Sequence, residues 1–151
     1  MADVKFYNGL SIACDGYYDK IKKYIDQAGS WQEAWQKAER ELNPKINPDR
    51  ELEKLNQLAI KIILRDDPDF PYLLKQINLP PLAIYVKGNL QIAHQPTVAI
   101  VGTRKATDIG RSFAFNLGAE LAGRKITIVS GLALGIDAAA HAGAVRVQEK
   151  N

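Results

Sequence analysis

The chain of 151 residues is 46% hydrophobic and 25% charged, a balance that is typical of folded globular proteins and excludes an intrinsically disordered chain. No apolar run approaches the ~18 residues of a membrane-spanning helix, and the first residues lack the pattern of a signal peptide, so we expect a cytoplasmic protein. The single cysteine, Cys14, excludes an internal disulfide and a cysteine-based metal cluster, and we expect it to be buried or inert.

The net charge of +3 is distributed unevenly along the chain. Residues 1–70 carry 11 basic and 13 acidic side chains, a net charge of −2, whereas residues 71–151 carry 9 basic and 4 acidic ones, a net charge of +5. A basic excess of this kind favours a polyanionic partner, although many soluble domains reach the same value without one. Nucleic acid is therefore one candidate partner of the second part.

The first part of the chain has the spacing of short helices. Ser30 and Glu33 form a capping box that opens one helix, and Asn47 followed by Pro48 is typical of an N-cap and the first helical position of another. Apolar residues follow both signals at helical spacing. We therefore predict a small helical domain over residues 1–59.

After residue 60 the apolar residues come in short β-rich runs. The candidate strands are residues 60–64, 82–86, 98–101 and 126–129. The last two lack alternation with polar residues, as expected for strands of a parallel sheet that is covered on both faces.

A helical stripe lies between the last two runs and completes a strand–helix–strand unit. Its apolar residues recur every four positions, and Thr107 or Asp108 can cap it; the stripe consists of Ile109, Phe113, Leu117 and Leu121. A second, alanine-rich helix is predicted over residues 136–147. We thus predict an α/β fold in which the helical bundle is followed by a Rossmann-like parallel sheet over residues 60–151. We expect this sheet to be incomplete, because a doubly wound sheet normally has more strands.

Each of the two core strands ends in a turn that contains glycine. The first turn is Gly102-Thr103-Arg104-Lys105, and the second is Ser130-Gly131-Leu132-Ala133, followed by Leu134, Gly135 and Asp137. Because parallel strands joined by a right-handed crossover end at the same edge, we expect the two turns to lie side by side.

These two turns are suited to an anion. Glycine lets backbone amides approach a phosphate, and the helix that follows directs the positive end of its dipole at the same point. Arg104 can hold a phosphate through two hydrogen bonds, and Lys105 adds a point charge. The alternative is that Gly102 and Gly131 only make tight turns and that Arg104 is solvated.

The spacing argues against the common nucleotide sites and against catalysis. The first turn lacks Gly-x-Gly-x-x-Gly, the second strand ends in Ser130 rather than an acidic residue, and no P-loop pattern is present, so we expect no cofactor. Asp137 is expected to stabilise a helix N-terminus and to pair with His141 in a structural role, while His94 is expected to be an exposed loop residue. We find no triad order, metal-ligand spacing or paired carboxylates.

Two long motifs resemble the DNA-processing protein A (DprA/Smf) family. They cover residues 97–107 with Gly110-Arg111, and residues 127–144, while the upstream residues 66–75 and 80–88 are also similar. The resemblance implies a SAM-like helical region and an extended Rossmann-like domain that binds single-stranded DNA, protects it and passes it to the recombinase RecA in natural transformation. It also implies a homodimer in full-length members and no established enzymatic activity.

The resemblance assigns contact with the DNA backbone to Arg104 and places residues 130–133 beside the same pocket. Lys125 stands where the family usually has glycine, and we expect Gly123 to act as the left-handed cap instead. The first 60 residues lack the family's Gly-x-Gly hairpin, and the later half of its Rossmann domain is not present. Two alternatives stay open, namely a nucleotide-processing enzyme of a related Rossmann-like group and an inactive truncated fragment.

Overall fold

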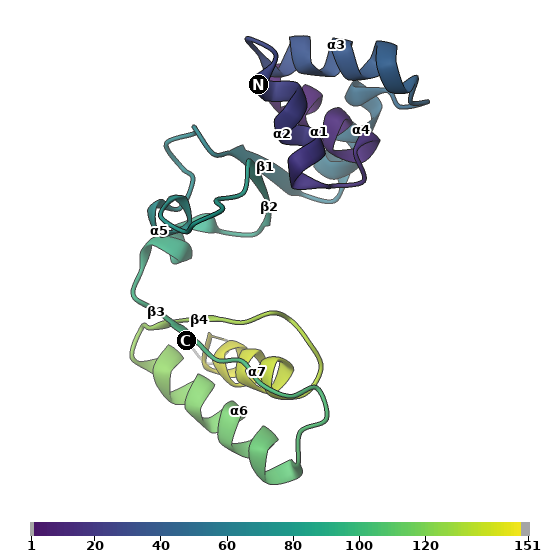
Figure 1. Ribbon diagram of the computed structural model, residues 1–151. Coiled ribbons are helices and arrows are strands. Elements are labelled where there is room, and N and C mark those ends of the chain that lie inside the picture. Colours follow the sequence, from purple (N-terminus) through teal and green to yellow (C-terminus); the bar gives the residue numbers. More distant parts are fainter. Residues whose placement is uncertain (1, 149–151) are drawn as a thin grey trace. The chain divides into compact units, whose positions relative to one another are not determined.

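The computed structural model describes residues 2–148 and divides into two compact units, Met1–Leu90 and Gln91–Asn151 (Figure 1). The predicted boundary after residue 59 differs from this division. Strands β1 (Ile60–Leu64) and β2 (Ala83–Lys87) belong to the first unit, because Ile62 on β1 and Ala83 on β2 are buried in the same core as the helices. The pairing of β1 with β2 is antiparallel.

Two of the four helices in the helical part of the first unit begin where the capping signals predict. Its helices are α1 (Ala2–Ala13), α2 (Tyr18–Asp26), α3 (Trp31–Leu42) and α4 (Pro48–Gln57). The Ser30 hydroxyl accepts a hydrogen bond from the Glu33 amide at 3.2 Å, and the Glu33 carboxylate reaches back to the Gly29 amide at 2.8 Å. The Asn47 side chain accepts the amides of Asp49 and Arg50 at 3.0 and 3.1 Å. Both predicted caps are confirmed.

The core of the first unit joins the helices to the strand pair. The rings of Tyr7 and Trp31 meet edge to face with centroids 5.1 Å apart. The Tyr85 hydroxyl on β2 donates to the side chain of the buried Asn8 on α1 at 3.0 Å. Cys14 is buried in this core, as predicted.

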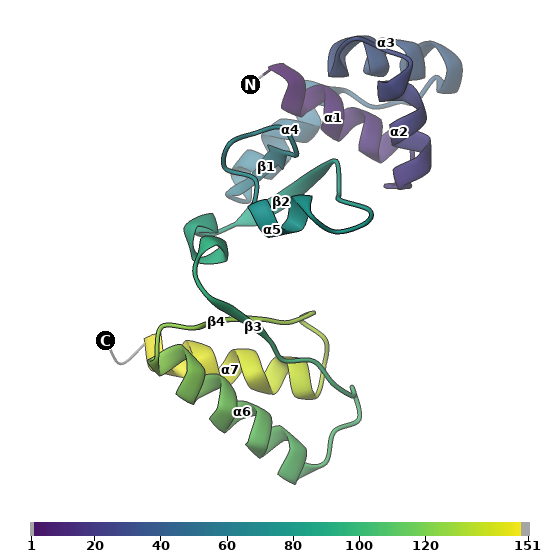
Figure 2. The ribbon, with the colours of Figure 1, turned by 60° about the vertical axis from the view of Figure 1, so that its left-hand side comes forward.

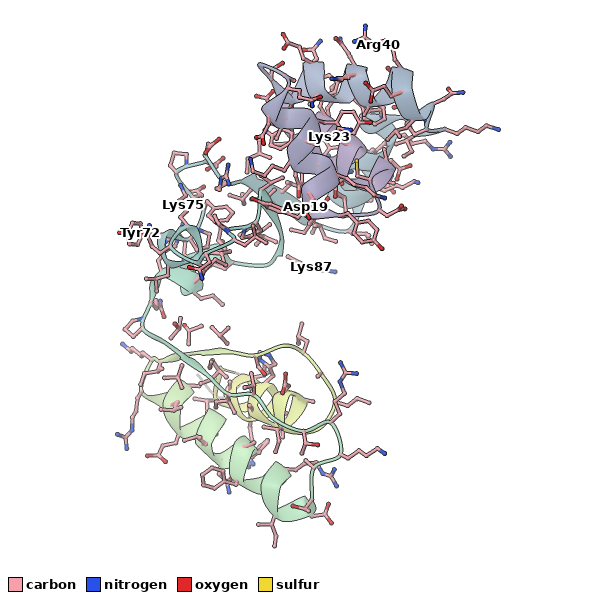
Figure 3. All side chains as sticks on the ribbon, in the orientation of Figure 1. Asp19, Lys23, Arg40, Tyr72, Lys75 and Lys87 are labelled. Atoms are coloured by element: carbon pink, nitrogen blue, oxygen red, sulfur yellow. The ribbon has the colours of Figure 1, made fainter. Side chains whose placement is uncertain are left out.

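The loop between β1 and β2 contains the short helix α5 (Tyr72–Lys75). The Lys75 ammonium donates to the Asp67 carbonyl at 3.4 Å and lies 5.7 Å from the centre of the Phe70 ring, which is buried. Tyr72 points away from the unit and is 67% exposed (Figure 3). Lys75 therefore contacts the earlier part of the same loop at Asp67 and Phe70, while Tyr72 contributes little to the core.

The second unit contains the predicted strand–helix–strand–helix order. After the short helix η1 (Leu90–His94), its elements are β3 (Thr97–Ala99), α6 (Asp108–Gly123), β4 (Thr127–Val129) and α7 (Ile136–Gln148). Strands β3 and β4 are parallel, with Val98 opposite Ile128, and the Thr107 hydroxyl caps α6 by accepting the Gly110 amide at 3.2 Å. The α/β class of the chain is confirmed.

Both helices of this unit lie on the same side of the β3–β4 pair (Figure 2). Within the described residues of the second unit, one face of the pair is therefore uncovered, and Val101 and Val129 are 69% and 49% exposed. Helices of this unit thus cover one face of these strands, where we expected both faces to be covered. The core lies on the covered face, around Ile100, Ala114 and Ala140.

The helices α6 and α7 approach each other through small residues. A Cβ atom on Gly118 would collide with the Ala140 carbonyl, so the buried face of α6 is centred on Ala114 and Gly118. These positions are one residue, about 100°, away from the predicted stripe. As a result Ile109 and Phe113, which the stripe placed in the core, are 84% and 70% exposed. Leu117 and Leu121 of the same stripe pack against the core as predicted.

The end of α6 differs from the expected cap. Lys125 itself has a positive φ of 62°, and Gly123 is not among the residues with positive φ. The Lys125 amide donates to the Ala122 carbonyl at 2.9 Å. Lysine therefore adopts the left-handed conformation that glycine adopts at lower cost.

Within residues 2–148 no helix has the length and apolar character needed to span a bilayer.

Candidate functional site

The two glycine-containing turns meet at one edge of the β3–β4 pair, as the sequence predicts. The Ile136 amide donates to the Thr103 carbonyl at 3.3 Å, and the Ser130 hydroxyl donates to the Ile100 carbonyl at 2.6 Å. Gly135 has a φ of 88°, and a Cβ atom there would collide with the Thr103 carbonyl and lie 2.8 Å from the Arg104 carbonyl. The turns thus pack backbone against backbone.

The backbone amides of Gly102 and Gly131 form a shared pocket for an anion, which we name the amide cradle. The structure places the carboxylate of Asp137 in it. One oxygen accepts the Gly102 amide at 3.2 Å and the other accepts the Gly131 amide at 3.0 Å. A Cβ atom on Gly131 would lie only 3.0 Å from that second oxygen, so glycine favours this close approach. Two amides that we expected to bind phosphate are therefore occupied by the chain itself.

The hydrogen bonds to Asp137 stabilise its charged form. Burial raises the pKa of this carboxyl, which is 4% exposed, but the hydrogen bonds from the amides of Gly102, Gly131 and Ala133 lower it below its usual value. Asp137 is thus a buried anion at neutral pH. Its interactions join residues from both turns.

Two cations project from the first turn. Arg104 and Lys105 are exposed, and neither side chain forms an ion pair or hydrogen bond with any of residues 2–148. The backbone that carries them is fixed, because the Lys105 amide donates to the Thr103 hydroxyl at 3.1 Å. Both charges are therefore available to a ligand.

Arg111 fixes the end of the same turn, a role that the sequence analysis did not assign. Its guanidinium donates to the Ala106 carbonyl and to the Asp108 carboxylate, both at 2.6 Å. Ala106 is buried, although Lys105 beside it is exposed. The spacing of Asp108 and Arg111, three apart in a first helical turn, was the available signal.

The second turn exposes two apolar side chains. Leu132 and Leu134 in the second turn are 82% and 76% exposed, and Leu132 has a positive φ of 55°. This conformation is uncommon for a residue with a branched side chain and costs free energy of folding. This edge of the strand pair therefore combines two exposed cationic side chains with exposed apolar ones, which suits a ligand with both phosphates and bases.

The two histidines lie outside this arrangement. No hydrogen bond joins Asp137 to His141 within the described part of the chain, so the predicted structural pair is wrong. The Nε2 atom of His141 is buried without a partner there, and the side chain lines a pocket of about 270 Å³ together with Lys125 and Thr127. His94 is exposed at the end of η1, as predicted.

The comparison with known proteins assigns the chain to one family. The family model described as DNA recombination-mediator protein A matches residues 61–151. The chain therefore belongs to the DNA recombination-mediator protein A family, also named DprA or Smf.

Individual relatives agree with this assignment. The chain is 42% identical over 106 residues to Protein Smf of Synechocystis, an alignment that covers 68% of this chain and 27% of the relative. It is 32% identical over 100 residues to DNA processing protein DprA of Bacillus subtilis, which covers 66% of this chain and 34% of the relative. The chain thus spans about a quarter to a third of these curated relatives.

A solved structure shows the same fold. The X-ray structure of DNA processing protein A from Streptococcus pneumoniae aligns with 97% of this chain and 50% of its own, with a TM-score of 0.61 and 25% sequence identity. The similarity covers both compact units of the present chain.

Proposed function

We propose that the second unit binds single-stranded DNA through its sugar-phosphate backbone at residues 102–105 and 130–133. The main support is the pair of exposed cations, Arg104 and Lys105, on a turn whose backbone is fixed from both sides. Membership of a DNA recombination-mediator family and the net charge of +5 in residues 71–151 favour the same ligand.

The side chains would share the contacts as follows. Arg104 donates two hydrogen bonds to one phosphate, and Lys105 neutralises a neighbouring one. The Thr103 hydroxyl, which accepts the Lys105 amide, can donate a hydrogen bond to a phosphate oxygen at the same edge. The exposed side chain of Leu132 contacts bases without selecting among them, and Ala133 borders the same surface. Binding of this kind tolerates any sequence and depends strongly on salt.

The relatives' names and the family description support a wider role, which we propose for the whole protein. Single-stranded DNA taken up by the cell would be protected at this site and passed to a RecA-type recombinase, and the full-length protein would act as a homodimer. This function is binding rather than catalysis. The carboxylate closest to the turns, Asp137, is fully engaged by hydrogen bonds and is not free to act as an acid or base.

The test is a salt titration of binding to a fluorescent oligothymidylate, with Arg104→Gln as the variant. A lost charged hydrogen-bonding partner costs about 1.5–3 kcal/mol, so we expect affinity to fall by roughly 10- to 100-fold. The slope of log affinity against log salt should become shallower by about 0.7, the value for one phosphate on a single strand.

Arg124→Gln is the matched control, because Arg124 is also exposed but is paired with Glu120 at 2.6 Å after the end of α6. It should bind like the unaltered chain. Equal affinities and slopes for the Arg104 and Arg124 variants would show that the site is elsewhere. Thermal stabilisation by mononucleotides but not by oligonucleotides would instead favour a nucleotide-processing enzyme, and no stabilisation by either would favour an inactive fragment.

A further inference from the structure

We infer that the amide cradle is an anion-binding site that the chain fills with its own carboxylate, and that Asp137 is the positioning residue for the Arg104 turn. DNA phosphates would then contact only the side chains of Arg104 and Lys105 and not the amides of the cradle. The part of this inference that concerns DNA rests on the proposed function, whereas the occupancy of the cradle does not.

The Asp137 carboxylate bridges the two turns. Each of its two oxygens accepts one amide from a different turn, at 3.2 Å from Gly102 and 3.0 Å from Gly131. These residues are 35 and 6 positions from Asp137 in the sequence, so the contact is made by the tertiary fold and not by the helix end alone. A phosphate presents two oxygens to a pair of amides in the same way.

The occupied amides and the charge of the carboxylate together disfavour a phosphate in the cradle. Asp137 is 4% exposed, and the Gly102 and Gly131 amides both donate to it. A phosphate sharing these amides would be repelled by the carboxylate. A DNA phosphate at this edge is therefore limited to the exposed side chains.

One of the amides that bind Asp137 belongs to the same short segment as the two cations. Gly102 is two residues before Arg104, and the next hydrogen bond along the turn joins Thr103 to Lys105. On the opposite side the Gly135 backbone abuts the Thr103 and Arg104 carbonyls. Removal of the carboxylate would free the Gly102 amide and loosen the segment that presents the guanidinium.

The experiment uses small anions in place of the missing carboxylate. Thermal unfolding of the full chain is followed for Asp137→Ala in formate or in inorganic phosphate, with chloride at the same ionic strength as reference. We expect a melting temperature below that of the unaltered chain in chloride, and a saturable rise on the order of 5 °C with formate or phosphate. The unaltered chain should show no rise in formate beyond chloride, because its own carboxylate occupies the cradle.

Two further variants separate positioning from general damage. Asp137→Asn fills the space but presents an amide nitrogen to one donor, so it should be destabilised without rescue by formate. Glu120→Gln removes an exposed carboxylate on the same unit, which is paired with Arg124, and should behave like the unaltered chain. If Asp137→Ala is unfolded in chloride, formate should restore its folding.

Oligothymidylate binding completes the test. Formate should restore the affinity that Asp137→Ala loses, and the salt slope should match that of the unaltered chain, because both cations are retained. Equal effects of formate on the unaltered chain and on Asp137→Ala would overturn the inference, as would failure of both anions to stabilise or refold this variant. Absence of DNA binding by the unaltered chain would remove the proposed function but leave the anion rescue intact.

Discussion

Replacing Gly135 by alanine tests whether the two turns depend on direct backbone contact. Gly135 has a φ of 88°, a conformation that residues with a Cβ atom rarely adopt. The added methyl group would collide with the Thr103 carbonyl and lie 2.8 Å from the Arg104 carbonyl. Both neighbours are backbone atoms, so a side-chain rotation cannot relieve the contact.

The structure sets the size of the effect. The left-handed conformation costs a non-glycine residue about 1–2 kcal/mol, and forcing an extra methyl group into a packed site costs about 1–3 kcal/mol more. The combined loss in free energy of unfolding is about 2–5 kcal/mol. For a unit of this size each kcal/mol corresponds to roughly 4–8 °C, so we expect the melting temperature of the second unit to fall by roughly 10 °C or more.

Gly123→Ala provides the matched comparison in thermal unfolding monitored by circular dichroism. No heavy atom lies within 4 Å of a Cβ at Gly123, and its φ is not positive. Alanine in this helical position raises the free energy of unfolding by up to about 1 kcal/mol over glycine, so the control should melt at the same or a higher temperature. Equal melting temperatures for the two alanine variants would refute the backbone contact on which the geometry of Arg104 depends.

Three further outcomes can be measured on the same unit. Lys125→Gly should raise the free energy of unfolding by up to about 1 kcal/mol in urea, because glycine adopts the positive φ of 62° without steric cost; unchanged stability would contradict a strained lysine. Gly118→Ala should lower it by about 1–3 kcal/mol, because its methyl group collides with the Ala140 carbonyl; a neutral result would show that α6 and α7 can separate. The lowered pKa of Asp137 means that its carboxylate stabilises the fold above the unfolded pKa of 3.8 and that this stabilisation is lost as pH falls through the folded pKa. Asp137→Asn should therefore flatten the acid limb of a plot of stability against pH, and an unaltered limb would contradict the hydrogen bonds in the cradle.

Residue spacing alone was enough to predict the local features of the chain. The caps at Ser30, Asn47 and Thr107 depend on residues within three positions of each other, so spacing alone identified them. The parallel pairing of β3 and β4 followed from two apolar runs joined by one helix, and it placed the two glycine-containing turns at the same edge.

The groups that these elements present to each other depend instead on contacts between distant parts of the chain. Asp137 accepts the Gly102 amide across 35 residues, and its preference for that amide over His141 follows from the close approach of two backbones that no local pattern encodes. The same kind of close contact at Gly118 rotates the buried face of α6 and exposes Phe113. Short-range hydrogen bonds fix where elements begin and end, but the free space between elements fixes which side chains are buried and which anion the amides accept.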